Sequence, residues 1–198
     1  ELGPNQDCLR LPGGLSPAAQ RLLAAGHLTV QDLTAMEIAP FCQPLADERI
    51  ADLCAAPGGK ATHLAELTQD QAHIDALDIA QPRVARLQEA VDRLGLTSVH
   101  VAQTDPAAPR PANLLRPHER ILVDAPCSNS GVLRRRVELR HRIAQVDLAA
   151  LETLQRRLLA QALDLIRPGG TVIYATCSIE PCENEDLVAS VLRDRPGV

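Results

Sequence analysis

The stretch RIADLCAAPGGKATHLAEL, residues 49–67, decides how the fold is read. Its first five residues, 49–53, are mostly apolar and typical of a short buried strand. Gly58 and Gly59 then permit a tight turn, in which main-chain N–H groups approach a ligand at the start of a helix predicted over 60–67. The stretch lacks the GxxxxGK[ST] pattern, because its threonine is displaced and the upstream glycine is missing, so an ATP-hydrolysing P-loop is disfavoured.

Strands and helices alternate along the rest of the chain. Further buried strands are predicted at residues 72–77, 99–102, 120–123 and 171–175. Further helices are predicted at residues 18–25, 32–45, 82–94 and 181–192, and from Asp147 to the stop signal Pro168-Gly169-Gly170. This alternation favours an α/β fold with a mainly parallel sheet and helices on both faces. In such a sheet, ligands gather at the carboxyl ends of the strands, where the strand order reverses.

Composition narrows the class of protein. The 198 residues suffice for one domain, and 45% hydrophobic with 23% charged residues is typical of a globular chain. No apolar stretch approaches the roughly 20 residues that cross a bilayer, so we expect a cytoplasmic protein with no membrane partner. Phe41 and Tyr174 are the only aromatic residues, which excludes a nucleic-acid surface built on aromatic stacking.

Basic residues are concentrated in one segment. The formal net charge is −5, so the chain as a whole is not a polybasic nucleic-acid binder. The segment 134–142 nevertheless begins with Arg134, Arg135 and Arg136. These side chains either contact phosphate groups or form a solvated helix face, and their pattern alone leaves both interpretations open.

The cysteine spacing argues against a structural metal or disulfide framework. The six cysteines are residues 8, 42, 54, 127, 177 and 182, and no two of them form a CxxC pair. Zinc sites need paired ligands a few residues apart, and disulfide frameworks belong to secreted chains. We therefore expect reduced thiols and no bound metal.

Four clusters of polar or reactive residues follow predicted strands. They are residues 54–60, Asp78, residues 124–128 and residues 176–178. Because the carboxyl ends of parallel strands meet at one edge of a sheet, the four clusters are expected to lie together. An acidic residue after the second strand suits a ribose, since one carboxylate accepts from both sugar hydroxyls. The pattern predicts a nucleotide-type ligand site.

Three motifs in this order resemble one known family. LCAAPGGKATHLAEL (53–67), DAPCSNSGVLRR (124–135) and YATCSIEPCENED (174–186) are similar to the RsmB/Sun (Fmu) family, which methylates carbon 5 of cytosine in RNA using S-adenosylmethionine. The similarity covers most of residues 26–186. It implies a Rossmann-like methyltransferase fold, S-adenosylmethionine as cofactor and an RNA substrate, with small-subunit ribosomal RNA ahead of transfer RNA.

The resemblance also implies which residues bind the cofactor. They are Cys54, Ala55, Ala56, Pro57, Gly58, Gly59, Lys60, Asp78, Arg83, Asp105 and Asp124. In this set the residues from 54 to 60 would hold the methionine part. Asp78, supported by Arg83, would bind the ribose hydroxyls, and Asp105 would meet the adenine edge. Asp124 would lie beside the methyl donor.

The implied catalytic residues are Cys177, Cys127, Asp124 and Lys60. Carbon 5 of cytosine is a poor nucleophile until a thiolate adds at carbon 6, which is the role that the resemblance gives to Cys177. Cys127 would help release the methylated product, with Cys127 or Asp124 assisting loss of the proton at carbon 5. Lys60 would either lower the pKa of a nearby thiol or balance the carboxylates.

The target base must leave its stack, because carbons 5 and 6 are shielded inside a helix. Unpaired or flipped-out cytosine is therefore expected. Arg134, Arg135 and Arg136 directly follow the second motif, where they would hold the phosphates on either side of that base.

The chain departs from the family pattern in several places. Thr104 stands where glycine is usual, and Asn129-Ser130-Gly131 replaces the common Gly-Thr-Gly or Ala-Thr-Gly. We expect residues 1–30 to be a connector or the tail of an N-terminal RNA-binding region. Residues 31–198 are then a monomeric methyltransferase domain that stops before the family's last two strands. A non-catalytic module that binds cofactor or RNA is the alternative to an active enzyme.

Overall fold

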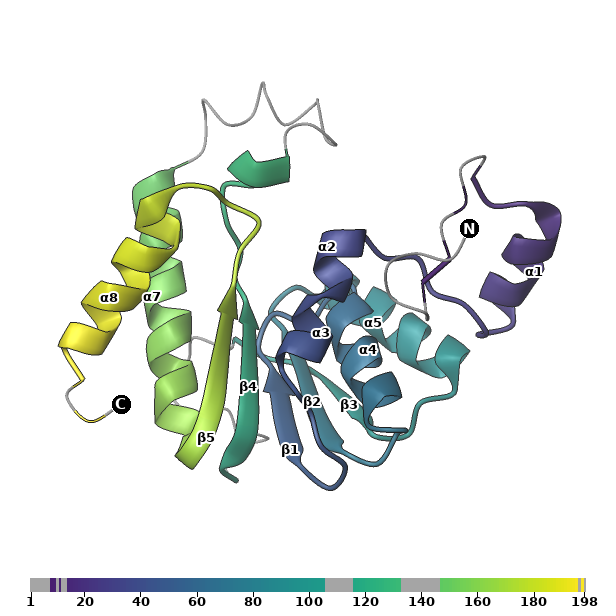
Figure 1. Cartoon of the computed structure of the whole chain (residues 1–198), viewed down its shortest axis with the longest axis horizontal. Helices are drawn as coiled ribbons and strands as arrows, with labels where there is room; N and C mark the ends of the chain where they lie inside the picture. Colours follow the sequence, from purple (N-terminus) through teal and green to yellow (C-terminus); the bar gives the residue numbers. More distant parts are fainter. Residues whose placement is uncertain are drawn as a thin grey trace.

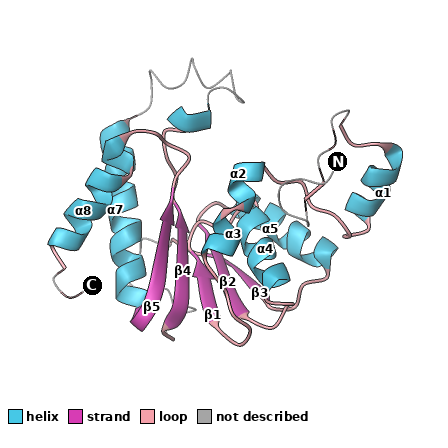
Figure 2. Ribbon diagram, viewed as in Figure 1, coloured by secondary structure: helices cyan, strands magenta, loops and turns pink. Residues whose placement is uncertain are grey.

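Five parallel strands form the centre of the protein (Figures 1 and 2). The computed structural model describes residues 8–9, 11, 14–105, 116–132, 147–195 and 197. Its strands are β1 (Arg49–Asp52), β2 (His73–Asp78), β3 (Val99–Gln103), β4 (His118–Asp124) and β5 (Ile166–Ala175), in the order β3-β2-β1-β4-β5. All four pairings are parallel, which confirms the predicted sheet. The strand order reverses between β1 and β4, so ligands are expected there.

Helices cover both faces of this sheet, as predicted. The helices are α1 (Pro17–Ala24), α2 (Leu33–Met36), α3 (Ile38–Phe41), α4 (Gly59–Leu67), α5 (Gln81–Leu94), α7 (Leu148–Leu165) and α8 (Glu185–Arg193). Figure 2 shows α3, α4 and α5 on one side of the strands and α7 with α8 on the other. Two short 3-10 helices, η2 (Ser130–Val132) and η4 (Pro181–Glu183), lie in the loops after β4 and β5. Among the described helices, none is long and apolar enough to cross a membrane.

Alternation along each strand creates two apolar cores. Successive side chains of a strand point to opposite faces, so Ile50 packs toward α4 and α5 while Ala51 and Leu53 pack toward α7. Leu159 of α7 packs on α8 in a third cluster. The sheet therefore packs against helices on both of its faces.

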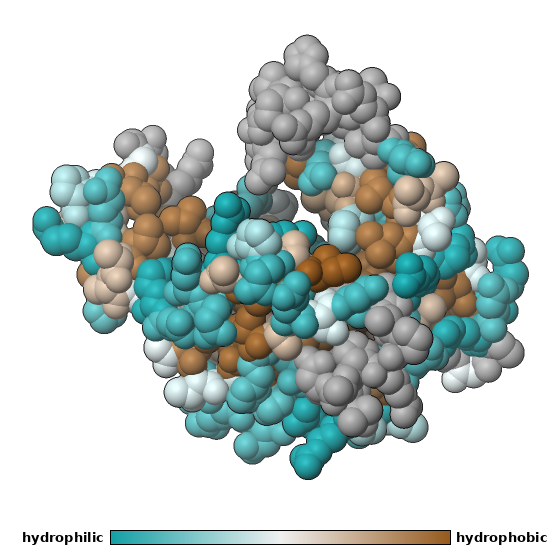
Figure 3. All heavy atoms as spheres, turned by 180° about the vertical axis from the view of Figure 1, so that it is seen from behind, coloured by the Kyte–Doolittle hydropathy of each residue, from teal (hydrophilic) through white to brown (hydrophobic). Residues whose placement is uncertain are grey.

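The molecular surface seen from behind carries separate apolar patches among hydrophilic side chains (Figure 3).

Two predicted helices are wrong in detail. The single helix predicted over 32–45 is instead two four-residue helices, α2 and α3. Pro40 explains the break, because it has no N–H to donate to the carbonyl of residue 36 and its ring crowds that carbonyl. The helix predicted over 181–192 is interrupted at Asn184, whose φ and ψ are −123° and −111°.

Strand β5 begins earlier than predicted. The Pro168-Gly169-Gly170 segment, expected to end the preceding helix, lies inside β5, and α7 already ends at Leu165. The register between β4 and β5 shifts at this point. A Cβ on Gly170 would stand only 2.9 Å from the carbonyl oxygen of Glu119. Glycine therefore allows the two strands to approach.

A buried ionic cluster lies at the opposite end of the sheet from the expected ligand site. Asp75 of β2 is 5% exposed and binds three neighbours. His118 Nε2 lies 2.9 Å and Arg49 Nη2 lies 3.0 Å from its Oδ2, while His73 Nε2 lies 3.2 Å from its Oδ1. The cluster joins the starts of β1, β2 and β4.

The N-terminal helix α1 is attached to α5 by one arginine. Arg93 Nη1 donates to the carbonyl oxygens of Leu23 at 2.7 Å and Leu28 at 2.9 Å. A Cβ on Gly26 would stand 2.0 Å from the carbonyl oxygen of Arg93, so only glycine fits there. An open pocket of about 540 Å³ lies between α1 and the outer side of the glycine turn.

Candidate functional site

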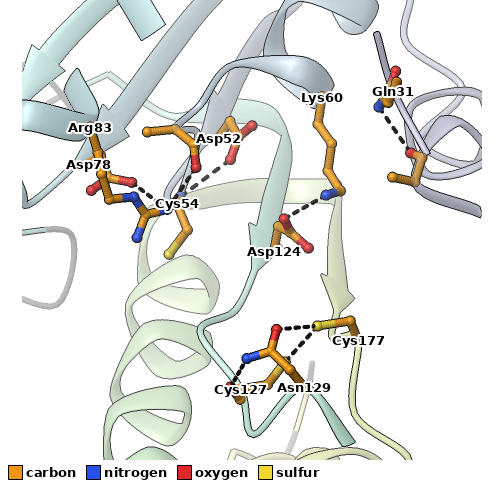
Figure 4. A network of polar contacts seen from close by, with 12 residues as sticks. Gln31, Asp52, Cys54, Lys60, Asp78, Arg83, Asp124, Cys127, Asn129 and Cys177 are labelled. Atoms are coloured by element: carbon orange, nitrogen blue, oxygen red, sulfur yellow. Dashed lines mark hydrogen bonds and ion pairs between the residues drawn. The ribbon is translucent and has the colours of Figure 1, made fainter. Parts of the chain in front are cut away.

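The carboxyl ends of β1, β2, β4 and β5 bring the predicted site residues to one edge of the sheet. Figure 4 shows Cys54, Lys60 and Asp78 near Asp124, with the pair Cys127 and Cys177 beyond it. The four clusters expected to share an edge therefore do so. Arg134, Arg135 and Arg136 lie outside the described residues.

The turn after β1 has the conformation that its glycines predict. Gly58 caps α4 with φ +113°, a left-handed backbone that favours glycine. A Cβ there would meet Leu87 Cδ1 at 2.9 Å. No side chain caps the first turn of α4, so its N–H groups and the positive end of the helix dipole are available to an anionic group.

Asp78 and Arg83 are connected directly to this turn. Asp78 is 3% exposed, and Arg83 Nη2 lies 3.1 Å from its Oδ2. The same Nη2 donates to the carbonyl oxygen of Ala56 at 2.7 Å. Arg83 thus fixes Asp78 against the loop. The Thr104 N–H donates to the carbonyl oxygen of Asp78 at 3.0 Å, which places Asp105 beside the end of β2.

Lys60 pairs with Asp124, which answers the question left open by its sequence. Lys60 Nζ lies 2.6 Å from Asp124 Oδ2, and both side chains are partly buried. At this distance the positive charge of Lys60 balances the negative charge of the Asp124 carboxylate. Of the two roles considered, the structure favours balance of the carboxylates.

Asp52 was not predicted as a site residue. It ends β1, is fully buried, and its Oδ1 accepts from the Cys54 N–H at 3.3 Å. Its Oδ2 has no hydrogen-bond partner among the described residues. Burial, with the nearby charge of Asp124, raises the pKa of Asp52 to about 7, although Lys60 opposes the shift. A carboxyl group in an otherwise apolar strand was the signal that could have found it.

The two predicted catalytic cysteines are in contact. Cys127 Sγ and Cys177 Sγ are 3.2 Å apart, with Cys177 exposed and Cys127 partly buried. The hydrogen bond from Cys177 lowers the pKa of Cys127 to about 7, against the effect of burial and with help from backbone N–H groups. The same contact and burial raise the pKa of Cys177. These opposite shifts favour Cys127 as the first of the two thiols to ionise.

Asn129 bridges the pair and was not among the predicted site residues. Its Nδ2 donates to the carbonyl oxygen of Cys127 at 2.8 Å, and its Oδ1 accepts from Cys177 Sγ–H at 3.0 Å (Figure 4). The sequence signal was its departure from the family's usual glycine or alanine.

Glu183 connects the two loops that carry the cysteines. Its side chain is fully buried. Its Oε1 accepts from the Ser128 N–H and from Gln155 Nε2, each at 2.9 Å. Its Oε2 accepts from the hydroxyls of Ser128 and Ser178. Ser128 follows Cys127 and Ser178 follows Cys177, so one carboxylate fixes both loops.

Asn184 adds further support next to Glu183. Its Oδ1 accepts from Thr176 Oγ1 at 2.7 Å, and its Nδ2 donates to the carbonyl oxygens of Ser178 and Glu180. These bonds explain the helix break at this residue. The loop that carries Cys177 is thereby fixed on both sides of the cysteine.

The polar groups after the carboxyl ends of β1, β2 and β4 fit a ligand that contains a nucleoside, an ammonium group and a carboxylate. Asp78 can accept from ribose hydroxyls, and the uncapped α4 N-terminus can receive a carboxylate. The orphaned Oδ2 of Asp52 and the carboxylate of Asp124 lie nearby. Within the described ranges, no group of three or more His, Cys, Asp or Glu side chains is arranged to hold a metal ion.

Comparisons with known proteins agree with this geometry. The family model described as "16S rRNA methyltransferase RsmB/F" matches residues 39–198. The "Probable ribosomal RNA small subunit methyltransferase B" of Synechocystis sp. is 41% identical over 94% of this chain. The chain spans only 42% of that relative's length.

Solved structures show the same relationship. The crystal structure of PH0851 has a TM-score of 0.87 and 34% identity, covering 93% of this chain and 42% of that one. The structure of NSun6 from Pyrococcus horikoshii, solved with SFG, has a TM-score of 0.77 and 31% identity, covering 90% of this chain and 45% of that one. Both values indicate the same fold, which agrees with the Rossmann-like methyltransferase fold predicted from the motifs.

Proposed function

The chain belongs to the 16S rRNA methyltransferase RsmB/F family, and from this premise we propose that it transfers a methyl group from S-adenosylmethionine to carbon 5 of a cytosine in small-subunit ribosomal RNA. The Synechocystis relative, named as a probable ribosomal RNA small subunit methyltransferase, favours ribosomal over transfer RNA. Position 5 of cytosine rests on the motif resemblance and on the two thiols.

The observation that carries the proposal is the thiol pair beside a lysine-paired carboxylate. Cys177 is exposed, so the cytosine ring of an RNA can reach its sulfur. Cys127 Sγ lies 3.2 Å from this sulfur. Addition of Cys177 to carbon 6 activates carbon 5, and the covalent adduct must then break to free the product. Cys127 assists this release.

S-adenosylmethionine supplies the electrophilic methyl group when it is bound. The similarity to NSun6, solved with SFG, an analogue of this cofactor, supports its use here. Residues 54–60 hold its methionine part, and Asp78, fixed by Arg83, holds its ribose. Asp105 receives the adenine edge and Asp124 faces the reacting group.

The base reaches the site unpaired or flipped from its stack. We assign the flanking phosphates to Arg134, Arg135 and Arg136. Changing Arg134 and Arg135 to Ala is expected to weaken RNA binding and to make the slope of log K against log salt shallower by about 1.4, the equivalent of two phosphate contacts on single-stranded RNA. Filter binding at several salt concentrations measures this slope, and an unchanged slope contradicts the assignment.

The surrounding architecture is also part of the proposal. Residues 1–30 form the tail of an N-terminal RNA-binding region, attached to the methyltransferase domain through Arg93. The domain acts as a monomer in the cytoplasm. An enzyme is favoured over a non-catalytic module, and the contact between the two cysteines and the Lys60–Asp124 pair support this choice.

The test is transfer of radiolabelled methyl to unmodified ribosomal and transfer RNA. Cys177→Ala is expected to abolish labelled 5-methylcytosine, and Cys127→Ala to leave a trapped protein–RNA adduct. Label in transfer RNA alone contradicts the choice of substrate. Cofactor binding without label in either RNA contradicts the proposed reaction and identifies a binding module.

A further inference from the structure

Asn129 places a side-chain amide beside the two sulfurs. Its backbone is left-handed, with φ of 63°. Asparagine tolerates this backbone better than most residues. The loop conformation is therefore compatible with an amide at this position.

The orientation of this amide is fixed by a neighbour. Nδ2 donates to the carbonyl oxygen of Cys127, so Oδ1 is the atom that faces Cys177 Sγ at 3.0 Å. An amide oxygen only accepts hydrogen bonds, so it stabilises Cys177 as a thiol and disfavours its thiolate. The backbone N–H of Asn129 lowers the pKa of the opposite partner, Cys127, whereas the backbone N–H of Cys177 lowers the pKa of both thiols.

Among the residues that the structure describes, the carboxylates around the pair act on both sulfurs. The charge of Asp124, at the end of β4, raises the pKa of Cys177, and the charge of Glu183, from η4, raises the pKa of Cys127. Each sulfur thus faces one carboxylate. Tyr174 of β5 also lies near Cys127, and burial raises its pKa so that it stays protonated.

We propose that Asn129 determines which cysteine carries the shared proton: Cys177 holds it in the resting site, and Cys127 accepts it when Cys177 attacks the pyrimidine. This inference rests on the proposed function. The Cys177 S–H turns from Asn129 Oδ1 to Cys127 Sγ, 3.2 Å away, and its bond breaks as the proton moves to Cys127 Sγ. A bond forms between Cys177 Sγ and carbon 6, and the electron pair of the C5=C6 bond moves to carbon 5, which takes the methyl group.

Product release reverses this proton transfer. A separate base takes the proton at carbon 5, and we assign that role to Asp124, the carboxylate whose charge acts on Cys177. The C–H electron pair restores the C5=C6 bond as the bond between carbon 6 and Cys177 Sγ breaks. Cys127 then returns its proton to the departing Cys177. Asn129 is accordingly a positioning residue for both steps.

The experiment is alkylation of the full chain by iodoacetamide between pH 5 and 10, without RNA or cofactor. Peptide mass spectrometry gives the rate at each cysteine separately. In the wild type, the Cys127 rate is expected to rise with a midpoint near 7, below that of Cys177. Asn129→Gly, which suits the left-handed backbone, should lower the Cys127-to-Cys177 rate ratio at pH 7 about five-fold, the equivalent of one ordinary hydrogen bond.

Asn129→Asp is the matched variant, because it keeps an acceptor oxygen and also tolerates this backbone. It should keep or increase the ratio and raise the Cys177 midpoint. An unchanged ratio in a folded Gly variant, a Cys177 midpoint that falls in the Asp variant, or a wild type in which Cys177 ionises first would each overturn the inference. Methyl transfer is assayed in parallel: its absence contradicts the proposed function, while the alkylation ratios still decide the role of Asn129.

Discussion

Replacement of Glu183 is expected to loosen the two cysteine loops together. This carboxylate is fully buried and accepts four hydrogen bonds, two of them from Ser128 and the others from Gln155 and Ser178. A buried hydrogen bond contributes a net of about 1 kcal/mol. Glu183→Ala should therefore cost about 4 kcal/mol, a large part of the 5–15 kcal/mol that stabilises a typical domain.

Glu183→Gln is the conservative variant. Its carbonyl oxygen can still accept from the Ser128 N–H and Gln155, while its NH₂ donates to hydroxyls that rotate to accept. Only the charge is lost, so a cost of about 1–2 kcal/mol is expected. Glu185→Gln, on the exposed first turn of α8, is the matched control and should change stability by about 0.5 kcal/mol or less.

Urea unfolding followed by circular dichroism measures these costs. With a slope of about 2 kcal/mol per M, Glu183→Ala lowers the midpoint by about 2 M and the Gln variant by under 1 M. Methyl transfer should fall about 100-fold in the Ala variant, because a shift of about 1 Å in reacting groups has that effect. A wild-type midpoint in Glu183→Ala would refute the reasoning, and so would equal activity in all three variants.

The pH dependence gives the same prediction an independent check. Burial alone would raise the pKa of Glu183, but hydrogen bonds from Ser128, Ser178 and Gln155 outweigh it and lower the pKa. A lowered pKa in the folded state adds stability above the unfolded value, near 4.3, and this stability is lost as pH falls further. The stability difference between the wild type and Glu183→Gln should therefore shrink below about pH 4.

Two further predictions follow from the turn after β1 and from the far end of the sheet. Gly58→Ala should lower the free energy of unfolding by about 1–3 kcal/mol, because the new Cβ would overlap Leu87 and alanine is strained in this left-handed backbone. It should also weaken cofactor binding, which calorimetry measures. Unchanged affinity and stability would contradict this prediction. Asp75→Asn should lower the melting temperature by about 10 °C at pH 7, since a broken buried ion pair costs about 3 kcal/mol. Burial alone would raise the pKa of Asp75, but the hydrogen bond from His118 and the charges of His73 and Arg49 hold it below its usual range. The loss should thus shrink as pH falls below about 4 and vanish only below the lowered pKa of Asp75, and a loss that stays constant as pH falls would contradict the ionic explanation.

The order of strands and helices could be predicted because it depends on local patterns. Apolar runs such as residues 49–53 bury themselves wherever a sheet forms, and Gly58 and Gly59 allow a turn whatever surrounds them. Strand polarity then places every following loop at one edge. The sheet, both helical layers and the meeting of Cys127 with Cys177 were therefore accessible from sequence.

Details within the segments were harder to predict. The break before Pro40 follows from a missing N–H and could have been found. The break at Asn184 could not, because it depends on partners in the loop that carries Cys177. The role of Lys60 was likewise open until its distance to Asp124, 64 residues away, was known.

By itself, the sequence determined the α/β alternation, the edge at which the site forms and the residue types available for chemistry. Only the tertiary structure decided that Glu183 is buried, that Asp52 is buried with an oxygen that has no partner in the described part of the chain, and that Asn129 faces Cys177. Ser128 lies 55 residues before Glu183, and Gln155 lies 28 before it. The direction of a polar side chain in a loop depends on such partners, because a buried carboxylate is stable only where their donors converge.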